Sequence, residues 1–234
     1  MHKLSKLQLK YIFLMKFLIW FLGLGILGFF IGKFIKHKSL YPFMPFRYDF
    51  RKRRNTFRKT LELLDITKAK VIIETGTSRE GLKGAKSNGG ASIVFGKWAK
   101  LNNAILHSVD ISEKSIKAAQ NEVDNQLLSE VVTIHHSDSI EFLAKFNKPV
   151  DFLYLDSYDY SNDPEVQVKS QIHHLNEFKA IEKHLHEKSI VLIDDCDLPN
   201  GGKGKMVVEY MKQKDWKVLI NAYQILLVRK NFSA

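Results

Sequence analysis

VIIETG at Val71–Gly76 is the first of three short apolar runs that end in acidic residues. The others are DFLYLD at Asp151–Asp156 and IVLIDD at Ile190–Asp195. Apolar runs of this length are typical of strands buried in a parallel sheet. Because ligands of open α/β sheets bind beyond the carboxyl ends of the strands, we expect the three ends to meet in one crevice. Carboxylates gathered there require a cation or hydrogen-bond donors to compensate them.

The rest of the sequence alternates between strand-like and helix-like segments. We predict strands at 70–76, 105–110, 131–136, 150–156 and 189–195. We predict helices from residue 55 onward and at 92–101, 112–127, 139–146, 165–186 and 206–214. Two final strand-like runs, 216–220 and 223–229, are separated by two residues, and so short a connection requires an antiparallel hairpin. The alternation predicts a doubly wound, mostly parallel α/β sheet that ends in this hairpin.

The positive charge of the chain is confined to its first quarter. The formal net charge is +11, and residues 1–54 hold twelve Lys or Arg and one acid. Residues 55–234 hold 24 basic and 24 acidic residues and are neutral overall. The charge therefore gives no reason to expect a nucleic-acid partner. The single cysteine, Cys196, excludes an internal disulfide and fits a reducing compartment.

A long apolar run at residues 11–32 predicts a transmembrane helix. Such a helix would be roughly 33 Å long, and the hydrocarbon core of a bilayer is about 30 Å thick. A cleavable signal peptide is the alternative, although its apolar region is usually shorter. Basic residues are more numerous on the C-terminal side of the run, which predicts a single-pass membrane protein with a cytoplasmic catalytic domain.

Composition predicts four regions: a short tail at 1–10, the transmembrane helix at 11–32, a basic juxtamembrane linker at 33–54 and a globular domain at 55–234. The RKRR cluster that ends the linker could touch anionic lipid headgroups, or it could be a solvated linker.

Two glycine-containing loops follow the first and the last acidic strand ends. The loop at 79–90 is unusually long, and we interpret it as functional, with a flexible surface loop as the alternative. The loop at 199–205 carries Lys203 and Lys205, which could meet a phosphate or carboxylate of a substrate. A mobile loop is the alternative there.

Candidate cofactor residues follow the first three strands. The first strand runs into ETGTS at Glu74–Ser78, where Gly76 allows a ligand to approach the backbone closely. Asp110 ends the second strand, where an acid commonly binds the two hydroxyls of a ribose. After the third strand, Asp138 and Ser139 could contact an adenine, and Asp138 equally fits the N-cap of the next helix.

Together these segments resemble a class I S-adenosylmethionine-dependent methyltransferase. The resemblance is carried by ETGTS, VDIS, HHSDS, VDFLYLD and the closing hairpin, and it covers about residues 55–230, the methyltransferase-like domain. It implies a Rossmann-like, seven-stranded sheet whose last strand is antiparallel, with S-adenosyl-L-methionine bound over the first strands. It implies cofactor contacts for Glu74, Gly76, Ser78, Asp110, Asp138 and Ser139.

A narrower resemblance concerns Asp156, Asp194 and Asp195. They resemble the metal ligands of the catechol and caffeoyl-CoA O-methyltransferases, except that Asp replaces Asn at the third position. This resemblance implies Mg²⁺ or another divalent cation that binds the acceptor hydroxyl and lowers its pKa. Two adjacent acids on a strand face opposite ways, so both can bind a cation only where the strand turns into its loop. The alternative is that Asp195 only satisfies loop amides.

The catalytic base is the point at which the sequence departs from those enzymes. They carry a lysine three residues after the first metal-binding aspartate, and here that residue is Asp159. Asp159 itself, His173 and His174 are the candidate bases, and Asp156 would hold the acceptor. The two histidines are adjacent on a predicted helix and cannot share a face.

The sequence thus predicts a membrane-anchored enzyme that transfers a methyl group to a hydroxyl oxygen. The acceptor would be a small molecule or a lipid- or sugar-linked hydroxyl. A nicotinamide-dependent oxidoreductase on a related fold is one alternative, but the sequence has no G-x-G-x-x-G fingerprint after the first strand. A non-catalytic, membrane-tethered, methyltransferase-like module is the other. The acids at each expected strand end argue against it.

Overall fold

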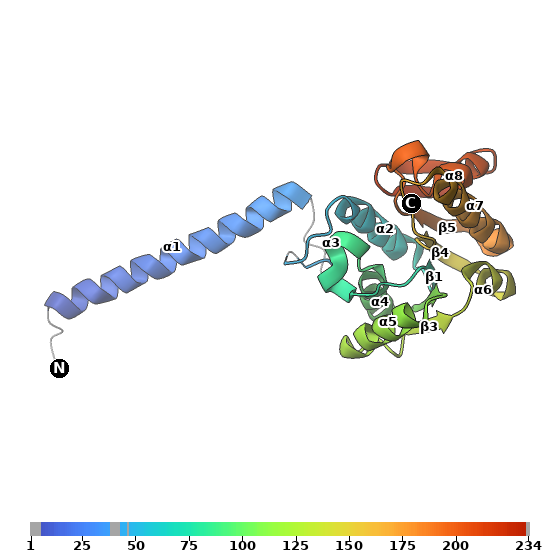
Figure 1. The fold of residues 1–234 in the computed structure, drawn as a ribbon. Coiled ribbons are helices and arrows are strands. Elements are labelled where there is room, and N and C mark those ends of the chain that lie inside the picture. Colours follow the sequence, from blue (N-terminus) through green and yellow to red (C-terminus); the bar gives the residue numbers. More distant parts are fainter. Residues whose placement is uncertain (1–5, 38–42, 46, 233–234) are drawn as a thin grey trace. The chain divides into compact units, whose positions relative to one another are not determined.

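The structure is a computed structural model that describes residues 6–37, 43–45 and 47–232. The chain divides into two units, Met1–Leu40 and Tyr41–Ala234 (Figure 1).

The described residues of the smaller unit form one helix, α1 (Lys6–His37). Its stretch Lys10–Gly32 has a mean hydropathy of 2.2, and none of it is buried within the structure. This stretch is long and apolar enough to cross a bilayer, a property that signal sequences share. The helix continues past residue 32, so residues 33–37 of the predicted linker are helical.

The larger unit is built on a seven-stranded sheet with the strand order β3-β2-β1-β4-β5-β7-β6. The strands are β1 (Val71–Thr75), β2 (Ile105–Asp110), β3 (Val132–His136), β4 (Val150–Leu155), β5 (Leu185–Ile193), β6 (Trp216–Asn221) and β7 (Ile225–Arg229). The last strand, β7, pairs antiparallel with β5 and β6, and the four other pairs are parallel. The predicted doubly wound α/β sheet with an antiparallel closing hairpin is confirmed.

Helices cover both faces of this sheet (Figure 1). They are α2 (Arg53–Thr67), α3 (Ala85–Asn88), α4 (Ala91–Asn102), α5 (Glu113–Asn125), α6 (Ser139–Lys145), α7 (Pro164–Ile181) and α8 (Lys205–Lys212). One buried apolar cluster contains side chains of α2, α4 and α5, and another contains side chains of α6, α7 and α8. Successive strand residues such as Leu153 and Tyr154 belong to opposite clusters. Because strand side chains alternate between faces, one sheet supplies both cores.

The hydrogen-bond ladder continues past the ends of the central strands. The N–H of Asp156 donates to the carbonyl oxygen of Thr75 at 3.0 Å, and the N–H of Asp194 donates to that of Leu155 at 3.0 Å. β1 lies between β2 and β4, where the strand order reverses. Doubly wound sheets bind their ligands at this point. The residues after β1, β4 and β5 are therefore held side by side where a ligand is expected.

The helix predicted at 165–186 is shorter in the structure. α7 ends at Ile181, a 3₁₀ turn covers Glu182–His184, and β5 begins at Leu185. Leu185 pairs with Val150 at the start of β4, so tertiary pairing overrides the helical pattern here.

The end of the predicted linker is built into the larger unit. Met44 and Phe50 are buried in the apolar cluster that contains α2. The guanidinium of Arg54 donates to the carbonyl oxygens of Met44 at 2.7 Å and Tyr48 at 2.9 Å. Arg53 and Arg54 are buried, and α2 begins at Arg53. Both arginines pair with groups inside the unit. They are therefore neither in contact with lipid headgroups nor part of a solvated linker.

Candidate active site

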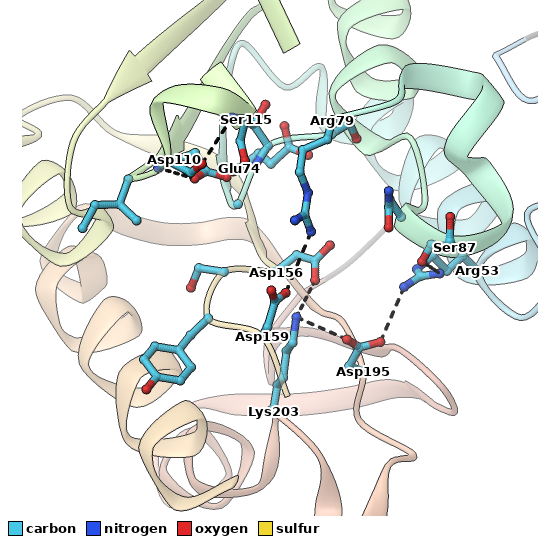
Figure 2. Close-up of a pocket in the computed structure, with 18 residues that line it drawn as sticks. Arg53, Glu74, Arg79, Ser87, Asp110, Ser115, Asp156, Asp159, Asp195 and Lys203 are labelled. Carbon is cyan, nitrogen blue, oxygen red and sulfur yellow. Dashed lines mark hydrogen bonds and ion pairs between the residues drawn. The ribbon is translucent and has the colours of Figure 1, made fainter. Parts of the chain in front are cut away.

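Two adjoining cavities lie at the carboxyl ends of the central strands. The first has a volume of about 510 Å³. Its lining includes the predicted residues Glu74, Gly76, Ser78, Asp110, Asp156, Asp159 and Asp195 (Figure 2). The second has a volume of about 270 Å³. Its lining shares Gly76 and Asp110 with the first and adds Asp138, Ser139 and His173. Of the predicted site residues, Asp194 and the candidate base His174 are in neither lining, and both are fully buried.

Gly76 is required by the backbone around it. Its φ is +79°, in the left-handed region that disfavours other residues. A Cβ atom on Gly76 would overlap the carbonyl oxygen of Asp156. The close approach that the sequence predicts at this glycine therefore involves the end of β4. Contact with a ligand stays a prediction.

Glu74 is buried and accepts hydrogen bonds from two serines. Its Oε2 accepts from the hydroxyls of Ser92 and Ser108, each at 2.6 Å. The Oγ atom of Ser92 in turn accepts the N–H of Ser78 at 2.9 Å. Burial raises the pKa of Glu74 to about 7, although the two serine hydroxyls oppose this rise. Glu74 thus holds the loop after β1 in place, a role beside the predicted contact with the cofactor.

The raised pKa of Glu74 predicts a pH-dependent stability. Between 4.5 and about 7 the folded protein holds this proton more tightly than the unfolded chain does. The free energy of unfolding therefore falls as the pH rises through this range, by about 3 kcal/mol in total. In Glu74→Gln this part of the decrease should be lost. Urea unfolding at about pH 5 and about pH 7.5 measures it.

Glu187→Gln is the control for that measurement, because Glu187 is exposed at the far end of the sheet. Its free energy of unfolding should fall with rising pH by as much as that of the wild type. If the free energy of unfolding falls equally with pH in the wild type and in Glu74→Gln, the pKa of Glu74 is the same in the folded and unfolded states.

Asp110 ends β2 and accepts backbone hydrogen bonds through both carboxylate oxygens. Its Oδ2 accepts the N–H of Thr77 at 3.1 Å, and its Oδ1 accepts the N–H of Ser112 at 2.8 Å. These contacts tie the loop after β1 to the start of α5. Because a carboxylate oxygen can accept more than one hydrogen bond, Asp110 keeps capacity for ribose hydroxyls in the cavities that it lines.

Asp138 and Ser139 contact protein groups at the edge of the second cavity. Asp138 is the N-cap of α6, and its Oδ1 accepts the N–H of Glu141 at 3.0 Å. The hydroxyl of Ser139 lies 3.1 Å from Nε2 of His173, which itself lies 3.3 Å from Oε1 of Glu177. The N-cap alternative for Asp138 is thus observed. Its place in the cavity lining is also what an adenine contact requires.

The candidate bases lie in different surroundings. Asp159 lines the first cavity together with Asp156, and its side chain is 88% exposed. His173 lines the second cavity with the predicted adenine contacts. His174 is fully buried, with Nδ1 2.7 Å from the carbonyl oxygen of Ser170. The structure therefore places Asp159, and neither histidine, in the same cavity as Asp156.

Asp156, Asp194 and Asp195 meet as the sequence predicts. One carboxylate oxygen of each lies within 4.8 Å of the others. Asp195 has a φ of +52°, so the chain leaves strand geometry between the two adjacent acids. This turn lets both acids face the same side, which an extended strand would prevent.

Two buried cations of the chain pair with these carboxylates. Nζ of Lys203 lies 2.8 Å from Oδ1 of Asp156 and 3.2 Å from Oδ2 of Asp195 (Figure 2). Nη2 of Arg53 lies 2.8 Å from Oδ2 of Asp194 and 3.5 Å from Oδ1 of Asp195. The side chains of Lys203 and Arg53 are only 3% and 7% exposed. Burial alone lowers the pKa of Lys203, but the three aspartates outweigh burial and raise it above its usual value.

Two tyrosine hydroxyls complete the network. The hydroxyl of Tyr154 donates to Oδ2 of Asp194 at 3.0 Å. The hydroxyl of Tyr223 donates to Oδ1 of Asp195 and accepts from Nη2 of Arg53 at 3.1 Å. Burial raises the pKa of both tyrosines, so each keeps the proton that it donates.

This arrangement does not fit a divalent cation between the aspartates. Carboxylate oxygens suit Mg²⁺, and the predicted ligands are close to one another. Within the described ranges, however, Lys203 and Arg53 already bring two positive charges to three negative ones. Lys203 also bridges Asp156 and Asp195, so an ion shared by those two acids would have to displace the ammonium group. We therefore assign no step of the reaction to a metal.

Sequence reasoning missed Arg53, Tyr154 and Tyr223. Arg53 belongs to a basic cluster that composition assigns to a linker, and the two tyrosines lie in runs that resemble strands. The sequence predicts that Lys203 meets an anionic group of a substrate, whereas the structure pairs it with acids of the chain. Charge is the sequence feature that could have indicated Arg53, because three converging carboxylates require cations close by.

Comparison with known proteins points to methyltransferases. Residues 86–196 match a family model described as a methyltransferase domain. A search of curated proteins gave no match.

Solved structures of similar fold are also methyltransferases. A Staphylococcus aureus protein proposed to be a caffeoyl-CoA O-methyltransferase is 16% identical, with a TM-score of 0.55 over 74% of this chain and 82% of its own. The methyltransferase PaMTH1 of Podospora anserina, bound to S-adenosylhomocysteine, is 14% identical, with a TM-score of 0.55 over 85% of this chain and 86% of its own. The O-methyltransferase TomG of Streptomyces achromogenes, in complex with S-adenosylmethionine, is 14% identical, with a TM-score of 0.52 over 77% of this chain and 82% of its own.

At such identities the likeness shows the fold. The resemblance that the sequence motifs predict is confirmed: the chain has the fold of the class I S-adenosylmethionine-dependent methyltransferases.

Proposed function

We propose that the chain is an S-adenosylmethionine-dependent methyltransferase that methylates a hydroxyl oxygen of a polar acceptor. Two adjoining cavities at the switch point of the sheet carry this proposal, because they share Gly76 and Asp110. The second cavity has the apolar side chains of Val109 and Ile111 beside Asp138, a combination that suits an adenine ring. The first cavity is lined mainly by polar and charged groups, which suit the methionine part and the acceptor.

The residues of the two cavities would bind and orient the reactants. S-adenosylmethionine, when bound, supplies an electrophilic methyl group on its sulfonium sulfur. Asp110 would accept hydrogen bonds from the ribose hydroxyls, and the backbone at Gly76 and Ser78 would face the methionine part. Glu74 would hold that loop, and Ser139 would border the adenine. Catalysis would then depend mainly on proximity and alignment, which fixed side chains provide.

The charged lining of the first cavity favours a polar acceptor. It includes Arg53, Arg79 and Lys203 together with Asp156 and Asp159. A hydroxyl of a sugar, or of a lipid- or sugar-linked molecule, matches this lining better than a flat apolar phenol does. Asp159 shares the cavity with Asp156 and would take up the hydroxyl proton.

We also propose that α1 anchors the enzyme in a membrane as a single pass, with the larger unit on the cytoplasmic side. The apolar stretch Lys10–Gly32 and the excess of basic residues after it support this orientation. An anchored enzyme would meet acceptors that are themselves held at the membrane.

A metal-assisted form of the same reaction is the second candidate. The observation that favours it is the convergence of Asp156, Asp194 and Asp195 within 4.8 Å, in the positions that resemble metal ligands. This form requires Lys203 to leave two of those acids. Binding of Mn²⁺ by the wild type decides between the two forms.

Calorimetric titration with S-adenosylhomocysteine tests the cofactor site. We expect the full chain in detergent to bind one equivalent. Asp110→Ala should bind at least about tenfold more weakly, since it loses the hydrogen bonds to the ribose. The control is Asp215→Ala, on an exposed position ahead of β6, which should bind as the wild type does.

Two outcomes would contradict the proposed function. One is a folded wild type that does not bind S-adenosylhomocysteine. The other is a wild type that binds a nicotinamide dinucleotide in its place, as an oxidoreductase would.

A further inference from the structure

The loop after β5 is built to bring Lys203 to the aspartates. The backbone N–H of Lys203 donates to the carbonyl oxygen of Asp195 at 3.1 Å. Gly202 has a φ of +56°, and a Cβ atom on it would overlap the same oxygen. A Cβ atom on Gly204 would crowd Sγ of Cys196. Only glycine allows packing this close, so the backbone on both sides of Lys203 is held in place. The position of its Cα atom is therefore fixed.

Lys203 is buried among acids and still reaches the first cavity. It is part of the cavity lining, although its side chain is 3% exposed. An ammonium group has three N–H donors. Asp156 and Asp195 account for two of them. The third donor can therefore meet an oxygen atom of a molecule in the cavity.

Arg53 satisfies the remaining aspartate in the same way. Its Nε and Nη2 atoms each lie 2.8 Å from Oδ2 of Asp194. The guanidinium also lies over the ring of Tyr223, 4.8 Å from the ring centroid. Within the described part of the chain, a metal ion entering the site would find all three carboxylates already paired.

We propose that the ammonium group of Lys203 takes the place of a divalent ion, binds the acceptor oxygen and makes the site independent of metal. A fixed positive charge at this point holds the acceptor oxygen and stabilises the negative charge that develops on it. Contact with the acceptor depends on the proposed function. The exclusion of metal does not, since it follows from the ion pairs alone.

Binding of Mn²⁺ tests the proposal without any substrate. Electron paramagnetic resonance measures free Mn²⁺ directly, so we would titrate the full chain in detergent with millimolar Mn²⁺. We expect no binding by the wild type. Lys203→Met removes the ammonium group but keeps an apolar stem, and it should bind one Mn²⁺, at least about tenfold more tightly than the detection limit that the wild type does not reach.

Two matched variants show whether Mn²⁺ binding by Lys203→Met comes from the loss of positive charge or from a disturbed loop. Lys205→Met changes an exposed lysine two positions further on, at the start of α8, and should bind no Mn²⁺. Lys203→Arg keeps the positive charge and should also bind none. Melting curves, recorded with and without Mn²⁺, show whether each variant is folded, and Mn²⁺ should raise the melting temperature of Lys203→Met alone.

Specific binding of one Mn²⁺ by the wild type overturns the proposal. Failure of a folded Lys203→Met to gain Mn²⁺ binding also overturns it. If Lys203→Met does not fold, the wild type and Lys203→Arg still decide the question. Titration with S-adenosylhomocysteine is independent of these results, so failure of the proposed function and failure of the metal exclusion are distinguishable.

Discussion

Replacing Arg53 with methionine will lower the free energy of unfolding by about 3 to 5 kcal/mol, because it leaves a buried carboxylate without its cation. That carboxylate belongs to Asp194, whose side chain is 0% exposed. After the change, Tyr154 still donates a hydrogen bond to it, but a neutral hydroxyl does not balance the charge. Methionine keeps much of the apolar stem of arginine, so the loss reports the missing charge more than missing packing.

Urea unfolding of the full chain in detergent, followed by tryptophan fluorescence, measures this loss. Trp98 and Trp216 are buried in the larger unit and report its unfolding. Arg51→Met is the control, because Arg51 is 59% exposed and its contact with Asp49 is 4.0 Å long. It should change stability by no more than about 0.5 kcal/mol. Equal, small losses in both variants would contradict a buried ion pair.

Gly76→Ala will have the second large effect. An alanine at a φ of +79° is strained, and its Cβ atom would overlap the carbonyl oxygen of Asp156. Strain and overlap together should cost about 2 to 4 kcal/mol of stability. Because both cavities share Gly76, the shift should also weaken binding of S-adenosylhomocysteine by at least about tenfold.

Gly201→Ala separates the two causes of that loss. Gly201 also has a positive φ, +87°, but the nearest atom to a Cβ there would be Cβ of Lys205 at 3.1 Å, a milder contact than the overlap at Gly76. This control should show mainly the cost of the left-handed backbone, about 1 to 2 kcal/mol, and bind the ligand normally. If the two variants lose the same stability, the overlap with Asp156 has no effect.

The sheet and the gathering of its acids could be predicted because they are local features of the sequence. A strand that is buried on both faces is a continuous apolar run, and its end is marked by the first polar residue. Glu74, Asp110 and Asp156 lie within one residue of such ends. The topology then brings them together without any further information.

The compensation of charge could not be predicted in the same way. Arg53 and Asp194 are 141 positions apart, and no sequence period links them. Arg53 lies in RKRR, where the composition indicates a linker equally well. The pairing depends on where α2 begins, and element boundaries are set by packing as much as by local pattern.

Short turns also could not be predicted from periodic patterns in the sequence. The loop at 79–90 contains a 3₁₀ turn at Gly81–Gly84 and the single turn of α3, neither of which is long enough to show a period. Tyr223 fits the apolar run of the last strand, yet it precedes β7 and points its hydroxyl at Asp195.

The paired arginines at the start of α2 set a limit on how far the protein can be shortened for biochemical work. Arg54 donates to the carbonyl groups of residues 44 and 48, while its neighbour Arg53 pairs with the buried carboxylate of Asp194. A version trimmed to Asn55, where the composition shifts, would lose both sets of contacts and leave Asp194 without its positive partner. Trimming should stop ahead of Phe43.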